Sequence, residues 1–148
     1  MVDKLLKVDA DNPANISLKG QLIELQGDTL GALKCYEESY ALDSMNYTIN
    51  SNLGRIYYNS ATKIESEFFD LRLYEKAYEY SMPLYLEAMK YYVNAFKLDK
   101  NHEDHTIAKT LRNVLYKQFS RADCKNPQEL IELYNDVSHT YGMECFPK

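Results

Sequence analysis

Apolar residues recur along most of the chain at three- and four-residue spacing, which is the spacing of one face of an α-helix. The clearest stripes lie within residues 16–23, 30–42, 49–57, 107–115 and 130–137. Only five Gly and four Pro interrupt the 148 residues, so few turns are available and the helices are expected to be long. The pattern predicts an all-α fold.

Local signals predict where several helices begin and end. Pro13 lies at the entry to a helix, where its missing N–H costs nothing. Gly27 tolerates the left-handed conformation that ends a helix, and Asp28 can cap the next one. Asn126, followed by Pro127 and by Glu129 three places later, predicts another capped start. Helices are therefore expected over 13–26, 30–42, 46–69, 73–98, 105–119 and 127–141.

The fourth of these helices is predicted to turn back sharply after a long first helix. Residues 60–68 contain neither Gly nor Pro, so the helix that begins near 46 is extended to Phe69. Asp70–Leu71–Arg72 is the expected turn. Pro83 removes a backbone hydrogen bond from the returning helix, which predicts a kink or a break around 80–82. The alternative is a new helix that starts at Pro83 with Ser81 as its cap.

Similar residues recur at a fixed distance, which is a sign of stacked helical hairpins. The recurrent pairs are Asn12 and Asn46, and Gly20 and Gly54, at 34 residues, then Ala32 and Ala88, and Tyr36 and Tyr92, at 56 residues. The larger distance implies that about 22 residues are inserted into the second hairpin, roughly between Ser60 and Pro83.

The small and aromatic residues at these positions resemble a known repeat. Gly54 and Tyr57 on one helix, and Ala88, Tyr92 and Ala95 on its partner, follow the tetratricopeptide pattern. Residues 1 to about 120 resemble such repeats, in particular bacterial tetratricopeptide proteins with an elongated second hairpin.

The resemblance implies antiparallel hairpins stacked as a short right-handed solenoid, in one domain over 1–148. Residues 1–12 would end a partial repeat, or form a short amphipathic starter helix that caps the array. Residues 13–45 would be the first repeat and 46–100 the second, with its insertion. A divergent third repeat and a closing helix that seals the core would occupy 104–142.

The resemblance also implies a non-catalytic interaction scaffold that binds a protein or peptide of unknown identity in a groove lined by the first helices. The expected groove residues are Gln21, Glu24, Ser51, Asn52, Arg55, Tyr58, Asn59, Lys109, Asn113 and Tyr116. Arrays that clamp the carboxyl-terminal tail of heat-shock chaperones place lysine and arginine in this groove. Only Asn52 matches their pattern, because Ser17, Gln21, Thr106 and Thr110 stand at the other positions, so this ligand is excluded.

Aromatic residues gather in the inserted hairpin, with Phe68 and Phe69 at its tip. They can cover the inner face of the hairpin, because aromatic rings bury a large area with few rotatable bonds. They can also form a recognition surface, since tyrosine is enriched at interfaces. Self-association into a homodimer, through this hairpin or through an open amino-terminal end, is the alternative function.

Charge and hydropathy exclude other partners. The net charge of -5 argues against a nucleic-acid ligand, which needs a positive surface. No run of about 18 apolar residues predicts membrane insertion. Residues 1–6 lack the apolar core and cleavage site of a signal peptide. A soluble, cytoplasmic protein is expected, with the cell envelope as the alternative if the chain is a fragment of a secreted protein.

Candidate chemistry is sparse. His102 and His105 flank Glu103 and Asp104, but a charged loop in which Asp104 caps the next helix explains this cluster better than a metal site does. Three cysteines without paired spacing give no disulfide framework, and Cys35 is expected to be a small packed residue. No catalytic residue, metal or cofactor is predicted.

Overall fold

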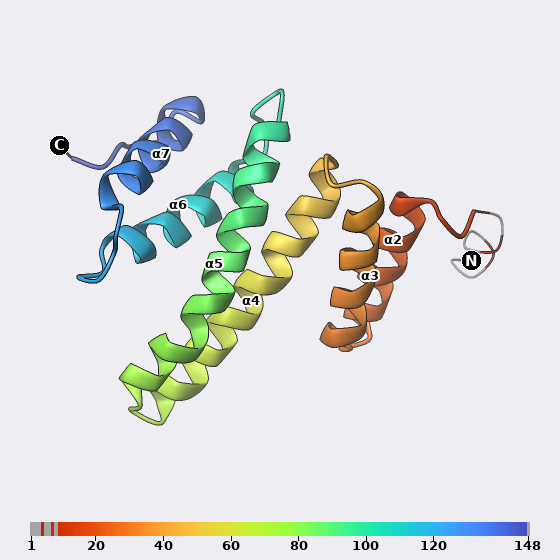
Figure 1. Cartoon of the computed structure of the whole chain (residues 1–148), viewed down its shortest axis with the longest axis horizontal. Helices are drawn as coiled ribbons and strands as arrows, with labels where there is room; N and C mark the ends of the chain where they lie inside the picture. Colours follow the sequence, from red (N-terminus) through yellow and green to blue (C-terminus); the bar gives the residue numbers. More distant parts are fainter. Residues whose placement is uncertain (1–3, 5–6, 8, 148) are drawn as a thin grey trace.

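A computed structural model describes residues 4, 7 and 9–147, and over 9–147 it contains six α-helices and no β-strand (Figure 1). The helices are α2 (Pro13–Leu25), α3 (Thr29–Leu42), α4 (Tyr47–Asp70), α5 (Tyr74–Leu98), α6 (His105–Phe119) and α7 (Pro127–Thr140). The predicted all-α class is confirmed. The partial repeat expected at 1–12 lies largely outside the described residues.

The helices pack mainly on their neighbours in sequence, and Figure 1 shows three helix pairs side by side. The central pair, α4 and α5, has 24 and 25 residues, whereas α2 and α3 have 13 and 14. This pair therefore projects beyond the others, as the inserted residues predict.

Most of the predicted helix boundaries are formed by the expected residues. Gly27 has a φ of 88°, and the Asp28 carboxylate accepts a hydrogen bond from the Gly31 N–H at 2.8 Å. Asp104 accepts hydrogen bonds from the first N–H groups of α6. The prediction at Asn126 was wrong in its detail, because this side chain makes no capping bond and donates instead to Glu129 Oε2 at 2.8 Å.

The long hairpin turns where the sequence predicts and continues where a break was the expected alternative. Arg72, with a φ of 57°, lies in the turn between α4 and α5. Helix α5 runs through Pro83, so the predicted break and the alternative start at Pro83 are both wrong. Ser81 caps nothing: it is fully buried within α5, and its hydroxyl has no partner among the described residues.

Small residues lie where the helices of each hairpin approach most closely. A Cβ atom at Gly20 would lie 2.8 Å from the Tyr36 ring, and one at Gly54 would lie 2.7 Å from the Tyr92 ring. Ala32 is completely buried in the same contact region. Each tyrosine ring thus fills the space that a side chain would need, which sets the spacing of α2 from α3 and of α4 from α5.

Candidate functional site

A polar cleft of about 340 Å³ separates α4 from the first turns of α6. Five of the predicted groove residues line it together: Ser51, Asn52, Arg55, Tyr58 and Asn59. Its other lining residues are Tyr92, Asp104, Thr106, Ile107 and Thr110. The spacing of the α4 residues explains the first group, because positions three and four apart share one face of a helix.

Arg55 forms one end of this cleft and is held by Glu24 of α2. Its Nη1 and Nη2 lie 2.5 Å and 2.7 Å from the two Glu24 carboxylate oxygens, a two-pronged ion pair. The Tyr36 hydroxyl donates a third hydrogen bond to Glu24 Oε2 at 2.8 Å. The hydrogen bond from Arg55 holds the pKa of Glu24 below its ordinary value, so the carboxylate stays charged at neutral pH.

Arg55 also joins the cleft to a second depression. This depression has a volume of about 400 Å³ and is lined by Gln21, Glu24, Leu25 and Arg55. The predicted groove residues of α2 and α4 therefore lie along one continuous surface, with the Glu24–Arg55 pair between the two hollows.

The predicted groove residues differ in how available they are to a ligand. Asn52 is buried, and its amide donates to the Ser17 hydroxyl at 3.2 Å. The Ser51 hydroxyl donates to the Tyr47 carbonyl at 2.7 Å, within α4 itself. Asn59 and Thr106, in contrast, are exposed on opposite sides of the cleft. These last two residues are best placed to meet a ligand.

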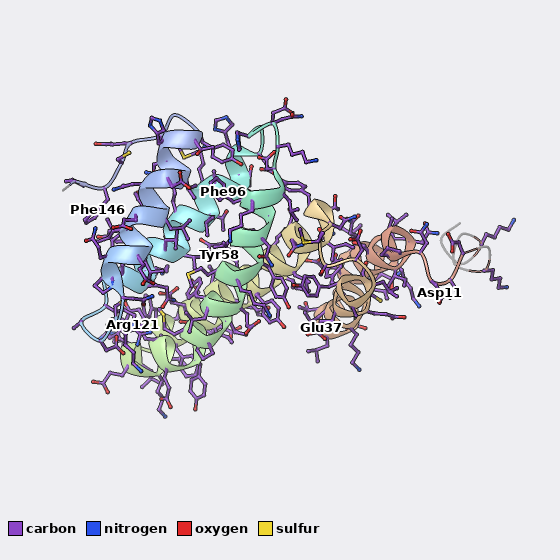
Figure 2. The ribbon with its side chains drawn as sticks, turned by 45° about the horizontal axis from the view of Figure 1, so that its top comes forward. Asp11, Glu37, Tyr58, Phe96, Arg121 and Phe146 are labelled. Carbon is purple, nitrogen blue, oxygen red and sulfur yellow. The ribbon has the colours of Figure 1, made fainter. Side chains whose placement is uncertain are left out.

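The structure does not bring the predicted residues of α6 into the same cleft. Lys109, Asn113 and Tyr116 line a separate depression of about 320 Å³, together with Arg112 and Tyr134. The Asn113 amide donates to the Tyr58 hydroxyl at 2.7 Å, which connects the edges of the two depressions. Figure 2 shows Tyr58 near the middle of the molecule. The single groove expected from the sequence is therefore divided at this hydrogen bond.

The hairpin tip packs largely on itself. Phe68 stacks on Tyr80 with ring centroids 5.4 Å apart, and Phe69 meets Tyr74 and Tyr78 edge to face at 5.3 Å and 5.7 Å. Both phenylalanines are half-buried, whereas the three tyrosines are about half exposed. The covering role expected for the aromatic residues is therefore confirmed, and tyrosine faces remain at the surface.

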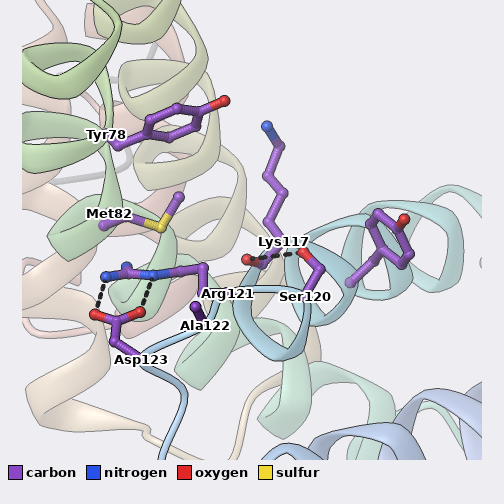
Figure 3. A pocket seen from close by; sticks show the side chains of 8 residues that line it. Tyr78, Met82, Lys117, Ser120, Arg121, Ala122 and Asp123 are labelled. Atoms are coloured by element: carbon purple, nitrogen blue, oxygen red, sulfur yellow. Dashed lines mark hydrogen bonds and ion pairs between the residues drawn. The ribbon is translucent and has the colours of Figure 1, made fainter.

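A depression that the sequence did not predict lies between α5 and the end of α6 (Figure 3). It has a volume of about 550 Å³; Tyr78 and Met82 line it from α5, and the 121–123 loop lines it from the other side. Both of its cations are already paired: Lys117 with Glu65 at 3.0 Å, and Arg121 with Asp123 at 2.6 Å. It therefore offers an apolar surface with neutralised edges.

The groups with candidate chemistry have structural partners. His102 and His105 both meet the Tyr141 ring edge to face, at centroid distances of 5.8 Å and 5.5 Å. Cys35 is buried, as predicted, and this burial raises the pKa of its thiol. The described residues contain no group of three or more His, Cys, Asp or Glu side chains arranged to hold a metal ion.

The described helices were also compared with what a membrane requires, and the whole chain with known proteins. None of the helices within the described residues is both long and apolar enough to cross a bilayer. Comparison with protein-family models and with curated protein sequences gives no match.

Proposed function

We propose that this chain is a non-catalytic scaffold built as a short tetratricopeptide-like solenoid, and that it binds an extended segment of another protein. The binding surface is the pair of depressions that meet at Arg55, on α2, α4 and the start of α6. Their continuity across two helix pairs is the observation that carries this proposal.

Three features of the fold support the solenoid. Consecutive helices form the main contacts, as in arrays whose units touch only their neighbours. Gly20 and Gly54 meet equivalent tyrosine rings although they lie in different hairpins. The residues that line the cleft come mainly from α4 and α6, the first helices of two pairs, as in the concave face of such arrays.

The chemistry of the cleft suits a peptide backbone. An extended peptide presents N–H and C=O groups in turn, so it needs donors and acceptors spaced along its path. Asn59 supplies both at the rim, and the hydroxyls of Thr106 and Thr110 lie on the α6 side. The charged Glu24–Arg55 pair is already neutralised, so it contributes orientation and hydrogen bonding rather than net charge.

The test is a selection of peptides followed by a comparison of variants. Random peptides displayed on phage are selected on the parent protein, and their dissociation constants are measured by fluorescence anisotropy. Asn59→Ala combined with Thr106→Ala is expected to weaken binding by about tenfold or more, since each lost hydrogen bond is worth about 1 kcal/mol. Asn101→Ala, exposed in the α5–α6 loop and outside the cleft, is the matched control. Equal affinity for all three proteins would place the binding surface elsewhere.

Self-association is a second candidate, favoured by the exposed apolar side chains around the hairpin tip. Leu71 is 67% exposed and Leu73 42%, beside Tyr74, Tyr78 and Tyr80. Grouped apolar side chains at the surface often mark an interface. Light scattering over a concentration series tests this: a dimer in the parent that Leu71→Ser with Tyr74→Ser abolishes supports it, and a strict monomer at high concentration rejects it.

A further inference from the structure

The segment after α7 folds back as an extended chain onto the outer side of α6 and α7. Gly142, with a φ of 63°, ends the helix, and the Met143 N–H donates to the Ser138 carbonyl at 2.7 Å. Residues 143–147 then continue without helical structure. Figure 2 shows Phe146 at the edge of the molecule, beside α7. The chain thus lays its own short peptide across two helices.

The Phe146 ring lies among three aromatic rings, from Tyr116, Phe119 and Tyr134. The centroid distances are 6.2 Å to Tyr116, 5.0 Å to Phe119 and 6.3 Å to Tyr134. Arg112 extends this group, because its guanidinium lies 4.7 Å from the centre of the Tyr134 ring. These three rings, called the aromatic cage below, hold the phenylalanine by edge-to-face contacts.

Two side chains bind the backbone of the segment rather than its side chains. The Phe146 N–H donates to Asn135 Oδ1 at 2.7 Å. Arg112 Nη2 donates to the Glu144 carbonyl at 2.6 Å, and the Glu144 side chain itself is exposed. Contacts to alternate residues of an extended chain, with one aromatic anchor, are the usual basis of short-peptide recognition. Any extended peptide with a suitably placed aromatic residue offers the same groups.

The surface around the cage is larger than its present occupant. The depression of about 320 Å³ lined by Arg112, Asn113, Tyr116 and Tyr134 adjoins the cage, because Tyr116 and Tyr134 belong to both. Arg112 Nε is buried and has no hydrogen-bond partner among the described residues. The segment therefore leaves both space and one guanidinium donor unused, which a longer ligand could take up.

We propose that the aromatic cage, with Arg112 and Asn135, is a binding site for an extended peptide that carries a phenylalanine. Residues 143–147 occupy this site within the same chain and close it to such a peptide. The site lies on the face of α6 and α7, apart from the cleft proposed above, so it is a second binding surface. A segment tethered at Gly142 acts at a high local concentration, of the order of millimolar, and therefore competes strongly with a free peptide.

The test opens the site in the full chain and offers the peptide separately. Phe146→Ala empties the cage, and circular dichroism confirms that this variant is folded. A labelled peptide with the sequence of residues 140–148, carrying Ser in place of Cys145, is titrated against the variant and the parent by fluorescence anisotropy. The Phe146→Ala protein is expected to bind the peptide about tenfold or more tightly than the parent.

Matched variants separate recognition from a merely structural role of the segment. Asn135→Ala added to Phe146→Ala should weaken peptide binding several-fold, whereas Asn59→Ala added to the same protein should leave it unchanged. A peptide with Ala in place of its phenylalanine should bind at least tenfold more weakly. The proposal is overturned if the folded Phe146→Ala protein fails to bind the peptide at millimolar concentration, or if the parent binds it equally well. A concentration-dependent dimer of the parent that Phe146→Ala abolishes would also overturn closure within one chain, because the segment would then be exchanged between copies.

Discussion

Lys117 Nζ lies 3.0 Å from Glu65 Oε1, although the two residues are 52 positions apart in the sequence. The Tyr85 hydroxyl donates to the other oxygen of the same carboxylate at 2.5 Å. Glu65 is only 8% exposed, so its charge depends on these two partners. The contact ties the projecting α4–α5 hairpin to α6, and three helices therefore meet at one buried carboxylate.

Removing the cation from this site should destabilise the protein more than removing the whole pair. Lys117→Met leaves the Glu65 carboxylate buried without a counter-charge and should lower the free energy of unfolding by about 3 kcal/mol. Lys117→Met combined with Glu65→Gln should cost about 1 kcal/mol, because no unpaired charge remains. Urea denaturation measures both values. Equal losses for the single and the double variant would show that the ion pair is not formed in solution.

Gly54→Ala should separate α4 from α5. The new Cβ atom would lie 2.7 Å from the Tyr92 ring, which is 4% exposed and has little room to move. Overpacking costs about 1 to 3 kcal/mol, and the better helix propensity of alanine recovers up to about 1 kcal/mol of this. A net loss of about 1 to 2 kcal/mol is expected from thermal or urea denaturation.

A second substitution checks that the Tyr92 ring is the cause of this loss. Tyr92→Leu removes the ring that would meet the new methyl group. In a double-mutant cycle, Gly54→Ala should therefore be much less costly in the Tyr92→Leu background than in the parent. Strictly additive effects would place the strain elsewhere.

Pro83→Ala should stabilise the protein. Pro83 is exposed within α5, where it removes one backbone hydrogen bond from a continuous helix. Alanine restores the donor and has the highest helix propensity, so the free energy of unfolding should rise by about 1 to 3 kcal/mol. A higher melting midpoint checks this. A lower one would mean that packing of the hairpin depends on the local geometry that proline imposes.

Alkaline pH should weaken the fold. Burial raises the pKa of Tyr57 to about 12, and burial also raises the pKa of Tyr36, Tyr85, Tyr92 and Tyr141. The folded state therefore favours the protonated phenols, whereas unfolded phenols lose their protons near pH 10. This contribution to stability is complete below pH 10 and declines as the pH rises above it.

Urea midpoints between pH 8 and pH 11.5 measure the effect, with absorbance at 295 nm to follow ionisation of the phenols. The midpoint should hold up to about pH 10 and then decrease, and Tyr85→Phe should make the decrease shallower because one of these phenols is gone. A midpoint that is constant up to pH 11.5 would contradict the burial of these hydroxyls.

The sequence by itself determined the helices and many of their ends. Stripes at three- and four-residue spacing, the Gly27–Asp28 turn and the cap at Asp104 depend on residues within a few positions of one another, so they can be identified along the chain. The recurrence of Gly20 as Gly54 also located the longer hairpin, because an insertion changes the distance between equivalent residues.

Only the tertiary structure decided how the candidate surfaces are divided. The Asn113–Tyr58 hydrogen bond joins residues 55 positions apart and separates α6 from the cleft that the sequence predicted as one groove. Phe146 reaches the aromatic cage because Gly142 turns the chain back onto α6. No local pattern predicts such contacts, because they depend on the distances between helices, and those distances are set by how the side chains pack together.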